Sequence, residues 1–202
     1  MTSTVGEAFK AAVARLAAAD RPASDAEELL SRLLGVGRGD LRRMAATPFA
    51  PEAAARFDAW LARRLAGEPV QYVTGRAAFR DLDLAVDPRV LIPRPETELL
   101  VDAVLEHLAR GDWSRRPPRV LDLGTGSGCI ALSIAHDFPR AEVTAVDASE
   151  AALAVARANA AVLGLDARVA FASGSWWDAV PSEERYDVVV SNPPYIAHAE
   201  AA

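Results

Sequence analysis

Short apolar runs alternate with helical patterns through the second half of the sequence, and this alternation restricts the possible folds more than any other property of the chain. Runs rich in leucine and β-branched residues, typical of buried strands, occupy 120–123, 143–146, 169–172 and 187–190. Helical patterns fill the intervals at 129–136 and 150–163. Because strands that alternate with helices form parallel sheets with right-handed crossovers, the sequence predicts an α/β domain.

Residues 1–74 have the periodicity of helices and predict a small helical bundle ahead of the α/β domain. Thr4 with Glu7, and Ser24 with Glu27, have the spacing of capping boxes at helix starts. Such a bundle can be purely structural, and it can also dock a partner.

Residues 75–94 predict an extended connector between the bundle and the second domain. Alternating apolar residues at 79–86 indicate a hairpin, and 90–92 predict a further short strand before a proline. Pro95 then starts a helix with acidic residues in its first turn. We therefore divide the chain into 1–74, 75–94 and 95–202.

Composition narrows the class of protein. The net charge of −6 provides no excess of positive charge to attract nucleic acid, so we expect no direct nucleic-acid partner. Cys129 is the single cysteine, which excludes a disulfide framework and favours a reducing compartment. The three histidines lack metal-ligand spacing, and no segment approaches the ~20 apolar residues of a membrane span. We expect a cytoplasmic monomer without metal.

The segment LDLGTGSG at 121–128 joins the first strand of the α/β domain to its helix. Its three glycines allow a tight turn and let backbone amides approach a ligand at the helix N-terminus. Cys129 departs from the dinucleotide pattern, which has glycine or alanine at that position. Asp147 ends the next strand, where an acidic residue grips ribose hydroxyls. Together these features predict a nucleoside-binding half-site, although the loop alone could be a structural turn. We expect Asp122 to brace the loop as a buried carboxylate.

Two further strand ends carry planar side chains. Trp176 and Trp177 follow the third strand, and we expect one to cover an aromatic ligand while the other packs inward. The last strand stops at SNPPY, where two prolines end the ladder. Asn192 beside Tyr195 suits gripping a planar amide or base; a plain proline-rich strand exit is the other interpretation.

Taken in order, GEPVQYVTG at 67–75, LIPRPETE at 91–98, LDLGTGSG, Asp147 and NPPY resemble the class I S-adenosylmethionine-dependent methyltransferases. More closely, the chain is similar to the release factor glutamine methyltransferase family. The resemblance implies a Rossmann-like methyltransferase sheet behind a helical N-terminal domain, residues 1–74, that docks the substrate. It also implies methyl transfer from S-adenosylmethionine to the glutamine amide of the Gly-Gly-Gln motif in class I peptide chain release factors.

The resemblance assigns roles to individual residues. The cofactor would be held by Gly124, Thr125, Gly126, Ser127, Gly128, Asp147 and Trp176, with Asn192 at its reactive end. The substrate would be gripped by Asn192, Pro193, Pro194 and Tyr195. The Asn192 side-chain oxygen and the Pro193 carbonyl would accept the two amide hydrogens, and Tyr195 would pack on the glutamine side chain. Asn192, Pro193 and Tyr195 thus form the implied catalytic group, and the chemistry requires no metal.

Two alternatives to this function remain open. A nucleic acid adenine methyltransferase could use the same Asn-Pro-Pro-Tyr grip on a flipped base, although the acidic charge disfavours it. A non-catalytic binding module with a remnant α/β domain would ignore S-adenosylmethionine. Relatives continue well past NPPY, so we expect a C-terminally incomplete sheet. An unpaired strand edge at 188–190 leads us to expect poor solubility and no turnover from these 202 residues alone.

Overall fold

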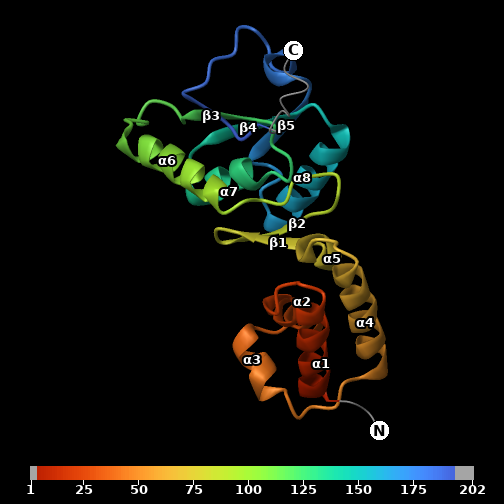
Figure 1. The fold of residues 1–202 in the computed structure, drawn as a ribbon. Coiled ribbons are helices and arrows are strands. Elements are labelled where there is room, and N and C mark those ends of the chain that lie inside the picture. The colour runs from red at the N-terminus through yellow and green to blue at the C-terminus, as the bar shows by residue number, and fades with distance from the viewer. Residues whose placement is uncertain (1–3, 194–202) are drawn as a thin grey trace. The chain divides into compact units, whose positions relative to one another are not determined.

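The structure, a computed structural model, describes residues 4–193, which form two compact units that divide between Gly75 and Arg76 (Figure 1). The first unit is helical, as predicted. Its helices are α1 (Val5–Ala18), α2 (Ser24–Leu34), α3 (Arg38–Arg43), α4 (Pro51–Leu65) and α5 (Val70–Thr74).

The start of α1 is a capping box. The Thr4 hydroxyl accepts from the Glu7 amide at 3.2 Å, and the Glu7 carboxylate accepts from the Thr4 amide at 2.8 Å. The second predicted box is wrong, because Ser24 is already helical and the preceding Ala23 makes no side-chain cap. The turn leading in from Pro22 supplies a carbonyl to the Asp25 amide, so the helix begins without a side-chain cap.

Leucine side chains from α1, α2 and α4 pack together in the core of the first unit. The fully buried ones are Leu16, Leu29, Leu30 and Leu61. Beside them Arg64 and Asp25, both largely buried, pair at 2.6 Å. The short helix α5 was not expected, since its five residues are too few to show periodicity.

The second unit begins with the predicted hairpin, β1 (Arg76–Phe79) paired antiparallel with β2 (Leu82–Ala85). The strand predicted at 90–92 is absent, and this segment is irregular. Val90 and Ile92 are buried while Leu91 is exposed, so burial alternates as in a strand. Flanking prolines at 88 and 93 remove the backbone donors that a ladder needs. The helix α6 (Glu96–Arg110) follows.

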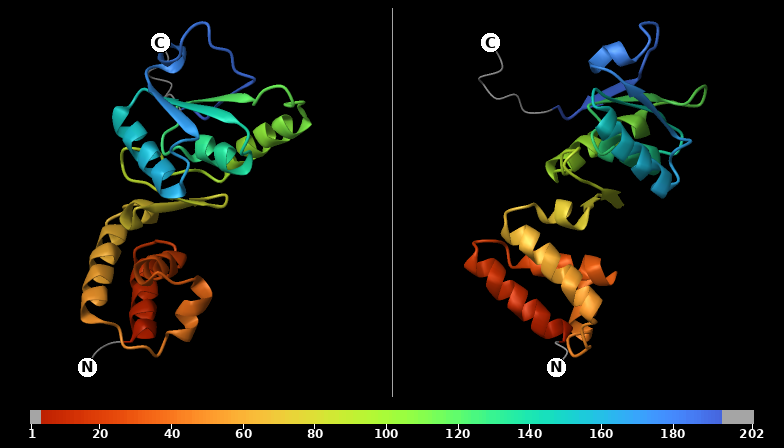
Figure 2. Two further views of the ribbon diagram at one scale, coloured as in Figure 1. Left: turned by 180° about the vertical axis from the view of Figure 1, so that it is seen from behind. Right: turned by 90° about the vertical axis from the view of Figure 1, so that its right-hand side faces the viewer.

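Four parallel strands form the central sheet: β3 (Arg119–Leu123), β4 (Glu142–Asp147), β5 (Val169–Ser173) and β6 (Val188–Ser191). They confirm the predicted α/β fold with strand ends shifted by about one residue. Helices α6, α7 (Cys129–Asp137) and α8 (Glu150–Leu163) lie along one face of the sheet (Figure 2). A short 3-10 helix, η1 (Trp176–Ala179), follows β5.

The strand order β5-β4-β3-β6 determines where a ligand can bind. The chain runs outward from β3 through β4 to β5, and then returns to place β6 on the opposite side of β3. Such a reversal opens a crevice at the carboxyl ends of the central strands. The glycine segment, Asp147 and Asn192 all follow these ends, so the topology brings them together.

Candidate functional site

A cavity of about 460 Å³ lies at the carboxyl ends of β3, β4 and β6. Its walls come from the glycine segment, the end of β4, the loop after β5, the segment after β6 and the irregular stretch before α6. They include Leu91, Gly124, Gly126, Asp147, Ser149, Trp176, Asn192 and Pro193. Residues far apart in the sequence therefore meet at the place that the strand order indicates.

The glycine segment turns sharply between β3 and α7. Gly124, Gly126 and Gly128 have φ values of 76°, 56° and 84°, a region that other residues rarely adopt. A Cβ added at Gly124 or Gly126 would meet no atom within 4 Å, so open space lies beside both. At Gly128 a Cβ would press on Leu132 at 2.9 Å. The first two glycines thus border the cavity, and the third permits helix packing.

Backbone amides of the segment are already bonded within the protein. The amides of Gly124 and Thr125 donate to the Val146 carbonyl, both at 2.9 Å, and the Gly126 amide donates to Asp147 Oδ2 at 2.8 Å. These bonds fasten the loop to β4 and occupy the amides that the sequence led us to expect at a ligand. A ligand can instead approach the loop because Gly124 and Gly126 have no side chains.

Asp122 braces the loop from beneath, as the sequence predicted. The side chain is fully buried, and Oδ2 accepts from the Thr125 hydroxyl at 2.7 Å and the Ala131 amide at 3.3 Å. Burial raises the pKa of Asp122 to about 7, opposed by these two hydrogen bonds. Burial also raises the pKa of the neighbouring Cys129 thiol to about 12, which disfavours the thiolate form at neutral pH.

Asp147 presents a carboxylate held by two backbone amides. Oδ2 accepts from Gly126, and Oδ1 accepts from Ser149 at 2.9 Å. Each carboxylate oxygen has a second lone pair, so the group can still accept from two ligand hydroxyls. The side chain is thereby oriented before any ligand arrives.

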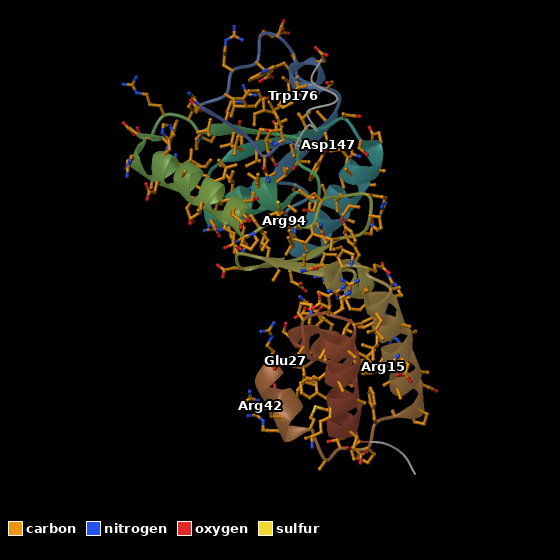
Figure 3. All side chains as sticks on the ribbon, in the orientation of Figure 1. Arg15, Glu27, Arg42, Arg94, Asp147 and Trp176 are labelled. Atoms are coloured by element: carbon orange, nitrogen blue, oxygen red, sulfur yellow. The ribbon has the colours of Figure 1, made fainter. Side chains whose placement is uncertain are left out.

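Trp176 stands at the rim of the cavity and has a φ of 51°, an uncommon conformation for a bulky residue. Figure 3 labels it together with Asp147 in the second unit. Trp176 and Trp177 are 53% and 55% exposed, so the expectation that one of them packs inward is wrong. Both belong to η1, in which no residue is buried.

Asn192 enters the cavity directly after β6. The Ser191 hydroxyl donates to the Leu123 carbonyl at 2.7 Å and holds this strand end against β3. The Asn192 Nδ2 donates to Thr97 Oγ1 at 3.0 Å. The acceptor Oδ1 makes no hydrogen bond to another residue of the described range, so the acceptor end of this carboxamide remains available.

The sequence-derived site residues divide into three groups. Gly124, Gly126, Asp147, Trp176, Asn192 and Pro193 line the cavity. Thr125, Ser127 and Gly128 lie beneath it, the first two with buried side chains. Pro194 and Tyr195 lie outside the described residues.

Two further residues that were not expected from the sequence also shape the site. Leu91 is 53% exposed at the cavity wall, and Thr97 contacts Asn192. The only sequence signal for both was their place in LIPRPETE, a segment without an evident chemical role of its own. Between residues 4 and 193, no group of three or more His, Cys, Asp or Glu side chains could hold a metal ion, and no helix is long and apolar enough to cross a membrane.

Comparisons with known proteins place this fold in a class. The structure superposes on a SAM-dependent methyltransferase from Agrobacterium tumefaciens with a TM-score of 0.50 and 23% identity, covering 59% of this chain and 39% of the other. Residues 96–202 match the family described as the methyltransferase small domain. The second unit therefore has the fold of S-adenosylmethionine-dependent methyltransferases.

Further matches define the family. Residues 7–75 match the PrmC N-terminal domain. The release factor glutamine methyltransferase of Bordetella pertussis is 50% identical over 89% of this chain and 64% of its own length. That of Koribacter versatilis is 45% identical over 98% of this chain and 69% of its own length. The chain belongs to the release factor glutamine methyltransferase family, and it spans about two thirds of the length of these relatives.

Proposed function

We propose that the full-length protein carrying this sequence transfers a methyl group from S-adenosylmethionine to a glutamine side-chain amide. The substrate is the Gly-Gly-Gln motif of class I peptide chain release factors. The supporting observation is the carboxamide of Asn192, which lies in the same cavity as the open glycine turn and the Asp147 carboxylate. Membership of the family supplies the substrate class.

The residues present fit the cofactor. Open space beside Gly124 and Gly126 admits a ligand that side chains would block. Asp147 retains lone pairs for the paired hydroxyls of a ribose, and the exposed Trp176 indole offers a face for an adenine ring. When bound, the cofactor supplies an electrophilic methyl group on a sulfonium. The cavity supplies the position of that group.

Asn192 and Pro193 would orient the substrate. An amide nitrogen is a poor nucleophile because its lone pair is delocalised, so its placement decides the rate. We assign Asn192 Oδ1 and the Pro193 carbonyl as acceptors for the two hydrogens of the glutamine amide. Such positioning can lower a barrier by roughly 7 to 11 kcal/mol in favourable cases. Pro194 and Tyr195 would complete the grip, with the tyrosine ring against the glutamine side chain.

The helical first unit would dock the release factor. We also propose that the protein is a cytoplasmic monomer and does not bind nucleic acid directly. A protein substrate is larger than a cavity of about 460 Å³, so it can also contact a second surface of this protein. The net charge of −6 fits a protein partner better than a nucleic acid.

Labelled methyl transfer tests the proposal. The full-length protein is incubated with labelled S-adenosylmethionine and either a release factor, the same release factor with Gln→Ala in its Gly-Gly-Gln motif, or DNA. We expect label in the first substrate alone. Label in DNA would support an exocyclic-amine methyltransferase, and equal label in the Gln→Ala release factor would contradict glutamine as the acceptor. Failure to bind S-adenosylmethionine would support a non-catalytic module.

A further inference from the structure

Thr97 makes a contact that the proposed function leaves unexplained. It lies in the first turn of α6, inside LIPRPETE, with only 6% of its surface exposed. Its Oγ1 accepts the hydrogen bond from Asn192 Nδ2 at 3.0 Å, across 95 positions of the sequence. A buried hydroxyl is thus aimed at the side chain placed at the reacting end of the cavity.

The orientation of a carboxamide decides what it can recognise. Asn192 has a donor end, Nδ2, and an acceptor end, Oδ1, which exchange places when the group turns by a half-rotation. A glutamine amide nitrogen presents two hydrogens, so it needs acceptors. If Nδ2 faced the substrate, donors would face donors, and the nitrogen would be pushed away from its position.

A contact of the preceding residue holds the end of β6 but leaves this rotation free. The Ser191 hydroxyl is bonded to Leu123, which fixes the preceding residue. Within residues 4–193, Thr97 is the one residue bonded to the Asn192 side chain. The Thr97 amide donates to the Arg94 carbonyl at 3.0 Å, and the buried valines of α6 anchor the helix below it, so its hydroxyl has a firm base.

We infer that Thr97 is a positioning residue that holds Asn192 with its acceptor oxygen toward the substrate amide. This inference rests on the proposed function, because it assigns the orientation that glutamine methylation requires. Thr97 itself does not line the cavity, so we infer that it acts through Asn192. It acts by accepting the hydrogen bond from Asn192 Nδ2, which leaves Oδ1 as the end of the carboxamide without a partner among residues 4–193.

Thr97→Val tests the inference because valine keeps the shape and removes the hydroxyl. At saturating cofactor and release factor, we expect kcat of the full-length protein to fall about 10-fold, the effect of losing one hydrogen bond. The dissociation constant for S-adenosylmethionine should stay within about twofold, since Thr97 does not line the cavity. Thr97→Ser should restore most of the turnover.

Thr144→Val is the matched control, since it makes the same exchange on β4 away from the cavity. We expect it to leave turnover unchanged. Unchanged kcat in Thr97→Val would overturn the inference. So would parallel losses of cofactor affinity and melting temperature in both Thr97 variants, because they would indicate a structural role alone.

A second readout does not depend on activity. In ¹⁵N NMR spectra of the protein, the Asn192 side-chain amide is identified as the pair of signals lost in Asn192→Asp. We expect this pair to shift in Thr97→Val and to keep its position in Thr144→Val. An unshifted pair contradicts the contact even if the protein methylates nothing. A shifted pair without any methyl transfer to release factor instead points to failure of the proposed function.

Discussion

The Asp122 carboxyl group shows how a single residue can make the stability of the site depend on pH. Its raised pKa of about 7 means that the folded state binds the proton more tightly than the unfolded chain does. Protonated Asp122 therefore contributes stability that is fully present below the ordinary aspartate pKa. That contribution is lost as the pH rises through the folded-state value.

Asp122→Asn should remove this pH dependence while its side-chain oxygen still accepts from Thr125 and Ala131. Between about pH 5 and about pH 8, we expect the wild type to lose unfolding free energy relative to the variant. Urea unfolding at both pH values measures the difference. A constant difference between the two proteins would show that Asp122 is ionised throughout.

The adjacent tryptophans allow a second test with a built-in control. Trp176 lines the cavity and Trp177 does not, although both are about equally exposed. Trp176→Ala should weaken S-adenosylmethionine binding about 10-fold, because stacking of a base on an aromatic ring contributes about 1–3 kcal/mol. Trp177→Ala should leave affinity unchanged. Calorimetry measures the affinity of both variants for S-adenosylmethionine, and equal losses of affinity would exclude a stacking role for Trp176.

Single residues were predictable where the chemistry is local. Asp122 precedes the glycines that it braces, and Asp147 ends the strand beside them, so spacing alone indicated both. The link between Thr97 and Asn192 was not predictable, since the packing of α6 beside β6 brings the two together. The exposure of both tryptophans also depends on how a loop folds, which no periodicity encodes.

At the scale of secondary structure elements, Asn159 joins three parts of the second unit. This side chain of α8 is 2% exposed, and its Oδ1 accepts from the Ala85 amide at 2.7 Å. Its Nδ2 donates to the Ala85 carbonyl at 3.0 Å and the Ser127 carbonyl at 2.9 Å. One buried amide therefore fastens the hairpin to both α8 and the glycine segment.

Asn159→Leu should destabilise the second unit by about 2 to 4 kcal/mol, because it leaves backbone groups of two segments buried without partners. Val162→Leu is the control, since it places the same leucine on the exposed surface of the same helix, and it should change stability little. Urea unfolding measures both variants. A loss of under about 1 kcal/mol in Asn159→Leu would contradict the fastening role.

Elements with strong periodicity were predicted well, and short or irregular ones were not. The strands of the central sheet and the helices between them follow from runs of apolar residues. The five-residue helix α5 and the irregular segment at 90–92 do not, because a few residues fit helix, strand and coil patterns equally. Tertiary packing decides the conformation of such segments.

At the scale of the whole molecule, we expect the sheet edge at β6 to favour self-association in solution. Among the described strands β6 is an edge, and Val189 on it is 44% exposed. Exposed apolar edge strands pair with other chains, and a charge on the edge prevents this pairing.

Val189→Lys should therefore reduce self-association of the 202-residue chain. Val162→Lys places the same charge on α8, away from any sheet edge, and should not. Light scattering across a concentration series compares the two variants with the wild type. Equal improvement by both would indicate a general effect of charge, and a wild type that stays monomeric would exclude edge pairing.

The most direct test of the account is methyl transfer by Asn192→Ala in the full-length protein, measured with release factor at a cofactor concentration that saturates the variant. Transfer should be nearly abolished while affinity for S-adenosylmethionine is much less affected, because Asn192 acts mainly on the substrate amide. Normal turnover by this variant would contradict the assignment of Asn192 and, with it, the proposed use of the cavity.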